Sequence, residues 1–253
     1  RQSILTVHRL EREVRREGGT DMYNILFKDM NCEKYKIIPV RRPDIPAPET
    51  RVTEYEVEGR DGILLENSGT YKQIKIEIEF NFLTDPETWA EVFRKAKEWL
   101  TGSGWLSLGD DQEYMYQVYY CGITDSERTS RRLGRFKAQF VCHPYMFLVS
   151  GKREYDYQSR EIQYNPYDIC HPIYKITGNG ICTLTVNGKA MKATVGQNLT
   201  IDTERMIAYR KDGTMMNTSV SGDYEDLYLK PGENEILITQ GFTLTVIPNW
   251  RSL

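Results

Sequence analysis

The sequence lacks the long hydrophobic runs and the excess of positive charge that mark two large classes of protein. No run of about 18 apolar residues occurs in the 253 residues, so no transmembrane helix is predicted. The net charge at pH 7 is −3, which argues against a protein that binds nucleic acid by neutralising its phosphates. A pore through which DNA only passes stays compatible with this charge.

Cysteine and histidine are scarce, with 5 and 3 residues. The odd number and wide spacing of the cysteines predict reduced, buried thiols rather than a disulfide scaffold. Cys-His-Pro occurs twice, at 142–144 and 170–172, and two such pairs invite a zinc site. Neighbouring side chains of a strand point to opposite faces, so each pair is poorly placed to chelate one ion. We therefore predict no metal and no cofactor.

Catalytic motifs are also missing. The chain has no GxSxG, HExxH, P-loop or dinucleotide-binding pattern. Glu77 and Glu79 could form a carboxylate pair for sugar hydrolysis, but most of their neighbours on the same strand face are charged. That pattern favours a solvated sheet face. No catalytic residue is predicted, and a hydrolase is the least favoured interpretation.

Residues 1–21 form a highly charged stretch without the apolar core of a signal peptide. Two interpretations stay open. In the first, Met22 is the true start, and Arg16–Gly19 reflects a purine-rich ribosome-binding site that has been translated. In the second, the stretch is an amphipathic helix with Leu5, Leu10 and Val14 on one side. We expect residues 1–21 to be an upstream extension or a non-native leader.

Two elements stand out in the first half of the chain. Hydrophobic and polar residues alternate from Ile74 to Phe82, which predicts a strand with one buried and one wet face. A helix is predicted next, with Asp85 as N-cap, Pro86 in its first turn and Gly102 at its end. Its predicted core residues are Trp89, Val92, Phe93, Ala96, Trp99 and Leu100.

Two long loops carry most of the candidate contact residues. Three prolines make residues 41–51 an extended loop, and the following Asp61-Gly62 dipeptide predicts a hairpin turn. A second loop, residues 128–135, is rich in arginine, and it is either a solvated hairpin tip or a protein contact. The predicted contacts with a neighbouring subunit or partner are Arg41, Arg42, Arg128, Arg131, Arg132 and Arg135.

The second half of the chain has short strands separated by turn dipeptides, which is typical of a β-sandwich. The turns include Asn179-Gly180, Asn187-Gly188 and Asp212-Gly213. Near the end, Lys230 to Glu233 has the chemistry of a type II turn, because Pro231 fixes φ and Gly232 permits a positive φ. A polar stretch, residues 150–161, precedes this half and predicts a seam between two domains.

Several of these segments resemble the siphophage distal tail protein family in order and spacing. The C-terminal DLYLKPGENEILITQGFTLTVIPNWRSL is similar to the family's L-x-PGEN-x-I turn and its final P-x-W-R strand. EGRDGILLENSGTYKQIKIEIEFNF, FVCHPYMFLVSG, NPYDICHPIYKITGNGICTLTVNG and TIDTERMIAY resemble further family segments. Together they cover most of Met22–Leu253. Asn165-Pro166 departs from the pattern, which often has Gly after Asn, and leaves that turn type open.

The resemblance implies a mainly β fold: an N-terminal β-sandwich "belt" domain with one α-helix, residues 22–150, a linker, 151–160, and a C-terminal galectin-like β-sandwich, 161–253. It also implies a structural protein of a phage, prophage or phage-derived particle, assembled in the host cytoplasm into the virion tail. Its partners would be itself in a six-fold ring, a tail tube protein, a tail-tip or tail-associated lysin protein and a receptor-binding protein. DNA would pass through the ring without sequence-specific contact, and no membrane would be involved.

One alternative from another class stays open, a carbohydrate-binding module for adhesion to a host surface. It would need exposed aromatic side chains beside polar groups on a sheet. The candidates are Tyr209, Tyr224, Tyr228 and Trp250, but the strand alternation places several of them towards a core.

Overall fold

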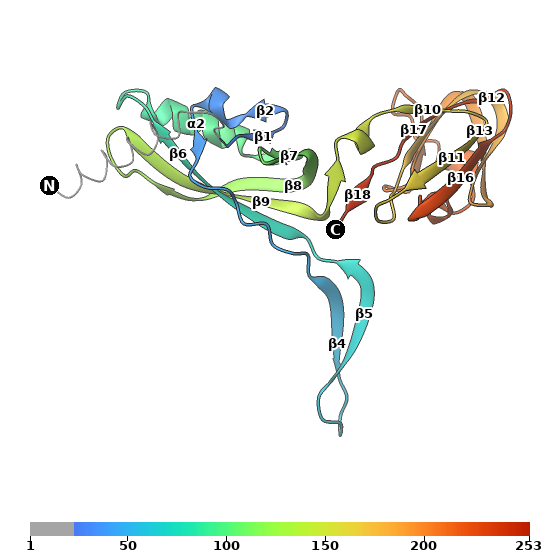
Figure 1. Cartoon of the computed structure of the whole chain (residues 1–253), viewed down its shortest axis with the longest axis horizontal. Coiled ribbons are helices and arrows are strands. Elements are labelled where there is room, and N and C mark those ends of the chain that lie inside the picture. Colours follow the sequence, from blue (N-terminus) through green and yellow to red (C-terminus); the bar gives the residue numbers. More distant parts are fainter. Residues whose placement is uncertain (1–22) are drawn as a thin grey trace. The chain divides into compact units, whose positions relative to one another are not determined.

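The structure is a computed structural model that describes residues 23–253. The predictions for residues 1–21 and for Met22 therefore lie outside the described residues. The described chain is mainly β, with one α-helix, and divides into two compact units (Figure 1). Unit 1 runs to Pro144 except for residues 113–115, which join residues 145–253 in unit 2. No helix in the described part of the chain is long and apolar enough to cross a membrane.

Unit 1 is built on a curled antiparallel sheet in the order β2-β1-β7-β8-β9-β6-β3. The longest pairing joins β6 to β9 and runs without a break from Ile74↔Cys142 to Leu83↔Leu133. A short 3₁₀ turn, η1 (Cys32–Tyr35), lies between β2 and β3. The strands are β1 (Ile25–Phe27), β2 (Met30–Asn31), β3 (Ile38–Pro39), β6 (Ile74–Leu83), β7 (Gly102–Leu108), β8 (Asp111–Glu127) and β9 (Leu133–Leu148).

The strand and helix predicted for unit 1 are both present, and they pack against each other. The inward residues of β6 are all buried, as the alternation predicts. Helix α2 (Trp89–Trp99) lies against one face of the sheet, and its Trp99 indole donates a 2.9 Å hydrogen bond to the carbonyl of Phe27. An aromatic cluster fills the space between them: Phe27, Phe80, Phe82, Phe93, Phe136, Phe140 and Trp99.

The start of helix α2 corrects the sequence prediction. Its N-cap is Thr88, not Asp85. The Asp85 carbonyl instead accepts a 3.0 Å hydrogen bond from the Thr88 amide, and the Thr84 and Thr88 hydroxyl groups lie 2.7 Å apart. The Asp85-Pro86 dipeptide therefore forms a turn before the helix. At the other end the helix stops at Leu100, whose amide donates to Ala96, before Gly102 is reached.

Unit 2 is a β-sandwich in which two long strands take part in both layers. β12 (Ile173–Val186) and β13 (Lys189–Asp202) pair along their whole length. The first part of β12 also pairs with β17 and its last residues pair with β16, and Gly178 lies between these two regions. The other elements are η2 (Ser150–Lys152), β10 (Tyr155–Tyr157), β11 (Arg160–Asn165), β14 (Ile207–Tyr209), η3 (Asn217–Ser219), β15 (Val220–Ser221), η4 (Tyr224–Leu227), β16 (Gly232–Ile238), β17 (Thr243–Ile247) and β18 (Arg251–Ser252).

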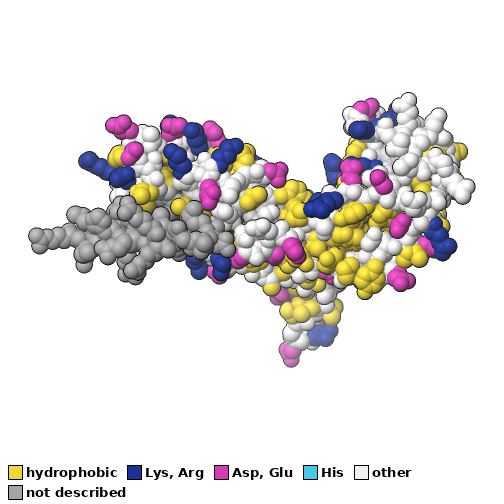
Figure 2. Space-filling view, turned by 45° about the horizontal axis from the view of Figure 1, so that its top comes forward, with side chains coloured by type: hydrophobic (Ala, Val, Ile, Leu, Met, Phe, Trp, Pro, Cys, Tyr) yellow, Lys and Arg dark blue, Asp and Glu magenta, His cyan; other side chains and the backbone are white. Residues whose placement is uncertain are grey.

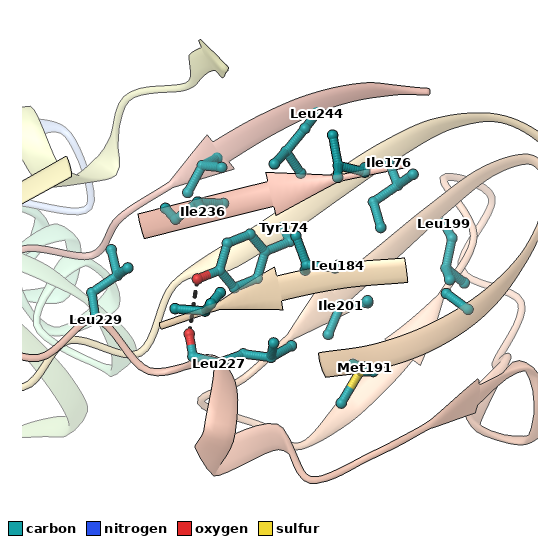
Figure 3. Close-up of a cluster of buried hydrophobic side chains, with 14 of the residues drawn as sticks. Tyr174, Ile176, Leu184, Met191, Leu199, Ile201, Leu227, Leu229, Ile236 and Leu244 are labelled. Carbon is teal, nitrogen blue, oxygen red and sulfur yellow. Dashed lines mark hydrogen bonds between the residues drawn. The ribbon is translucent and has the colours of Figure 1, made fainter. Parts of the chain in front are cut away.

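Tyr174 lies at the centre of the unit 2 core (Figure 3). Its side chain is fully buried, and its hydroxyl donates a 2.8 Å hydrogen bond to the carbonyl of Leu227. The surrounding side chains come from both layers of the sandwich and include Ile176, Leu184, Met191, Leu199, Ile201, Leu229, Ile236 and Leu244. Leu244 and Val246 of β17 are also in this core.

The predicted linker, residues 151–160, differs in the structure because it belongs to unit 2. β10 pairs with β17, and the Gly151 carbonyl accepts a 2.8 Å hydrogen bond from the Asn249 amide. Gly151 is buried so close to Trp250 that an added Cβ would lie 2.4 Å from the Trp250 backbone nitrogen. Polar composition was a poor guide here, because short edge strands keep polar side chains in solvent while their backbone pairs.

All five cysteines are free and buried, as their spacing predicts. Burial raises the pKa of both Cys121 and Cys142 to about 12. A raised thiol pKa stabilises the fold fully below the unfolded value near 9 and loses that effect as the pH rises towards 12. Stability should therefore fall from about pH 9 upward.

We expect the free energy of unfolding of unit 1 to drop by about 2 kcal/mol between pH 9 and pH 10 from these two thiols. Urea titrations at pH 8, 9 and 10 would measure it, followed by tryptophan fluorescence, since three of the four tryptophans lie in unit 1. Cys142→Ala should remove about half of the pH dependence attributed to the thiols. An unchanged slope in that variant would contradict the assignment.

Candidate interaction surfaces

A two-stranded hairpin projects from unit 1 and pairs with no other strand that the structure describes (Figure 1). It consists of β4 (Thr50–Glu56) and β5 (Ile63–Tyr71), and we call residues 50–71 the arm. Its turn is closed by a 3.1 Å hydrogen bond from the Arg60 amide to the Val57 carbonyl. Gly62 adopts a positive φ of 83° there, which confirms the hairpin turn predicted from Asp61-Gly62.

The two faces of the arm differ in chemistry. Directly paired residues of an antiparallel hairpin share a face, so the pairs of β4 and β5 define each face. One face, which we call the carboxylate face, carries Val52, Glu54, Glu56, Ile63, Leu65 and Asn67. On the other face the Tyr55 hydroxyl donates a 2.8 Å hydrogen bond to Glu66, beside Leu64.

The arm exposes a contiguous set of hydrophobic side chains. Val52, Ile63 and Leu65 are 40%, 47% and 56% exposed, and every residue from 50 to 70 is exposed. Figure 2 shows hydrophobic and charged side chains together on this projection. A lone two-stranded hairpin is marginally stable in water, and contiguous exposed apolar side chains mark an interaction site. The arm is therefore a candidate interaction surface.

A second surface is the turn between β8 and β9, residues 128–132, which we call the arginine tip. It contains Arg128, Arg131 and Arg132 and no acidic residue. The Arg128 guanidinium lies 4.7 Å from the centre of the Trp89 ring, and Arg132 is 3.5 Å from Asp85. Arg131 forms no ion pair with any residue between 23 and 253.

The structure separates the other predicted arginines from this tip. Arg135 lies on β9 and forms an ion pair with Glu79 of β6, in a shallow polar hollow of about 360 Å³ that Asp125 also lines. Arg41 and Arg42 lie in the proline-rich loop before the arm. They pair with Asp44 at 3.0 Å and with Asp110 at 3.5 Å. The six arginines therefore occupy three places and do not form one patch.

The turn at Pro231 and Gly232 is held by a residue that our sequence reasoning missed. Gly232 has the positive φ, 96°, that the turn requires. Asn234 is fully buried, and its side-chain amide donates to the carbonyls of Lys230 and Gly232 while its oxygen accepts from the Lys230 amide. The asparagine of the PGEN string was the available signal, since this residue type commonly bonds to the backbone of a turn.

The two Cys-His-Pro segments lie in packed parts of the fold. Cys142 and Cys170 are buried, and no group of three or more His, Cys, Asp or Glu in residues 23–253 is placed to hold a metal. His171 stacks on Tyr228 and contacts Glu204 through Nδ1, and its Nε2 lies 3.1 Å from the Arg251 guanidinium. Arg251 also donates a 2.6 Å hydrogen bond to the Ile169 carbonyl, which ties the last strand to unit 2.

The aromatic residues predicted for sugar binding do not form an exposed platform. Trp250 is only 8% exposed and packs in the core of unit 2, and Tyr228 is half-buried against His171. Tyr209 and Tyr224 are also half-buried. Trp250 is buried because the final residues fold back onto the end of β9, where Arg251 pairs with Phe147. Tyr164 on β11 is the most exposed tyrosine of unit 2, and it was not among the predicted residues.

Comparison with solved structures identifies this arrangement. No protein-family model and no curated protein matches the chain. The crystal structure of SPP1 Dit, described as a paradigm of the hub adsorption apparatus in phages that infect Gram-positive bacteria, superposes with a TM-score of 0.63. The match covers 92% of this chain and 99% of that protein. This chain has the fold of a phage distal tail protein.

The likeness to the distal tail protein confirms the fold and the resemblance predicted from the sequence. Sequence identity between the two chains is 11%, so the two proteins share a fold although most of their side chains differ. The alignment extends through both units rather than one sandwich, which a shared β-sandwich alone would not produce.

Proposed function

We propose that this protein is a structural hub of a phage tail. In this role it assembles with itself into a six-fold ring, joins the tail tube to a tail-tip or tail-associated lysin protein, and offers a site for a receptor-binding protein. The observation that carries the proposal is the match to SPP1 Dit over both units and over nearly the full length of each chain. The proposal assigns no catalytic role to the chain.

The surfaces of the protein support a role in assembly. Residues 50–70 of the arm are all exposed, and contiguous exposed apolar side chains such as Val52, Ile63 and Leu65 mark an interaction site. The net charge of −3 suits a ring through which DNA passes without being held. The proposed site of action is the virion tail, after assembly in the host cytoplasm.

The test is the mass and shape of the purified protein. Light scattering after size-exclusion chromatography should give about six times the chain mass of 29.5 kDa, and negative-stain microscopy should show rings with an open centre. Addition of the tail tube protein from the same genome should produce capped or stacked assemblies. A monodisperse monomer at all concentrations, without binding to the tube protein, would refute the hub.

The carbohydrate-binding module remains the competing function, and the same preparation can test it. With Trp250 buried and Tyr228 stacked on His171, the predicted sugar platform is missing from unit 2. We therefore expect a column that carries host cell-wall polysaccharide at a millimolar sugar concentration not to retain the purified protein. Specific retention of the monomer would favour the module over the hub.

A further inference from the structure

The arm and the arginine tip carry opposite charge. Residues 52–67 of the arm hold five carboxylates and one arginine, whereas the tip holds three arginines and no carboxylate. Glu54, Glu56, Glu58 and Asp61 form no ion pair with any described residue, and Arg131 is likewise unpaired within residues 23–253. Both surfaces thus present unpaired charge of opposite sign.

The two surfaces lie at opposite ends of one strand. The arm rejoins the sheet at Tyr71, just before Ile74, which pairs with Cys142 at one end of β6. The arginine tip leads directly into Leu133, which pairs with Leu83 at the other end. The ten residues of β6 separate them by about 30 Å. Figure 1 shows the arm extending away from the end of the sheet where β8 and β9 join.

In the structure, the arm therefore lies away from the arginine tip of its own chain. Two copies arranged head to tail can bring an arm onto an arginine tip, because each then offers a different surface to each of its neighbours. Such a heterologous contact is the kind that closes a ring or extends a filament. The exposed apolar side chains and unpaired carboxylates of the arm have no binding partner within the described part of their own chain. A head-to-tail contact between two copies provides one.

We propose that the carboxylate face of the arm docks on the arginine tip of a second copy of this chain. This inference rests on the proposed hub and names the contact that would join its subunits. Glu54 and Glu56 pair with Arg131 and Arg132 of the next copy, and the guanidinium planes suit these carboxylates because they donate in a fixed fork. Ile63 and Leu65, which pair with Glu56 and Glu54 across the hairpin, cover the aliphatic stems of the arginines.

The experiment exchanges the charges between the two surfaces. One variant carries Glu54→Arg and Glu56→Arg, and the other carries Arg131→Glu and Arg132→Glu. Each variant alone sets like charges against each other at every contact. We expect the chain concentration at half-assembly to rise at least about 10-fold in each, as measured by analytical ultracentrifugation.

Mixing the two variants should restore assembly. In an equimolar mixture the reversed arm of one chain meets the reversed tip of the other, and the native arm meets the native tip, so an alternating ring of six can close. The altered residues are exposed, and unchanged melting temperatures would show that both variants fold. Glu66→Arg is the matched control, because Glu66 lies on the other face of the arm, and it should assemble within about 2-fold of the wild type.

The outcomes separate this inference from the proposed function. Wild-type rings with variants that assemble normally alone, or with folded variants whose mixture stays dissociated, would refute the contact and leave the hub standing. A wild-type chain that never associates would refute both. Wild-type rings, two defective variants and a competent mixture would establish that arm and tip meet between copies.

Discussion

Removal of the arm should give a folded protein that no longer associates with itself. The change replaces residues 52–67 by Asn-Gly, which joins Arg51 to Ser68, whose hydroxyl already donates a 2.9 Å hydrogen bond to the Arg51 carbonyl. Asn-Gly is the preferred two-residue hairpin turn. Every removed residue is exposed, so the core of unit 1 loses nothing. We expect the melting temperature to change by less than about 2 °C.

Self-association should be lost because the exposed apolar side chains and four unpaired carboxylates of the arm are removed together. Sedimentation velocity at increasing concentration would measure it, with calorimetry on the same sample to confirm the fold. A shortened chain that still forms rings would show that assembly depends on other surfaces. A melting temperature lower by 10 °C or more would show that the arm stabilises unit 1.

Two adjacent leucines give a finer control for this prediction. Leu65 lies on the carboxylate face and Leu64 on the opposite face, and both are about half exposed. Leu65→Ser should weaken association more than Leu64→Ser, although the two changes are chemically identical. Equal effects would mean that the partner covers both faces of the arm.

Tyr174→Ala should destabilise unit 2 by about 4 kcal/mol. The substitution leaves a cavity where a fully buried aromatic ring packs against both layers of the sandwich, and losses of about 3–5 kcal/mol are typical of such changes. It also leaves the Leu227 carbonyl without the hydroxyl that donates to it (Figure 3). Because whole domains are stable by only about 5–15 kcal/mol, unit 2 should become marginal.

Urea unfolding followed by near-ultraviolet circular dichroism would measure the loss. Tyr174→Phe keeps the ring and removes only the hydrogen bond, so it should cost about 1 kcal/mol. The difference between the two variants separates packing from hydrogen bonding. A Tyr174→Ala protein within 1 kcal/mol of the wild type would contradict the central position of this side chain in the core.

Local patterns in the sequence were enough to predict several elements. Alternation along Ile74–Phe82 and the helical spacing of Trp89 to Leu100 predicted β6, α2 and the faces that they bury, since a side chain's direction follows from the period of its own element. Asp61-Gly62 and Pro231-Gly232 predicted turns, because the demand for a positive φ is also local. The two-domain organisation was predicted from the polar stretch at residues 150–161 and from the resemblance of longer segments to the distal tail protein family.

What the sequence alone did not decide depends on contacts between distant segments. Helix α2 begins after Thr88 rather than after Asp85, because residues 85–88 form a turn closed by the hydrogen bond from the Thr88 amide to the Asp85 carbonyl. Trp250 is buried because β18 returns to the end of β9.

Likewise, Asp61-Gly62 predicted a hairpin turn, but only the sheet pairings show that β4 and β5 pair with each other and with no other described strand. The sequence determined which faces are hydrophobic. Only the tertiary structure decided which of those faces are covered, because burial depends on which other segment of the chain packs against each face.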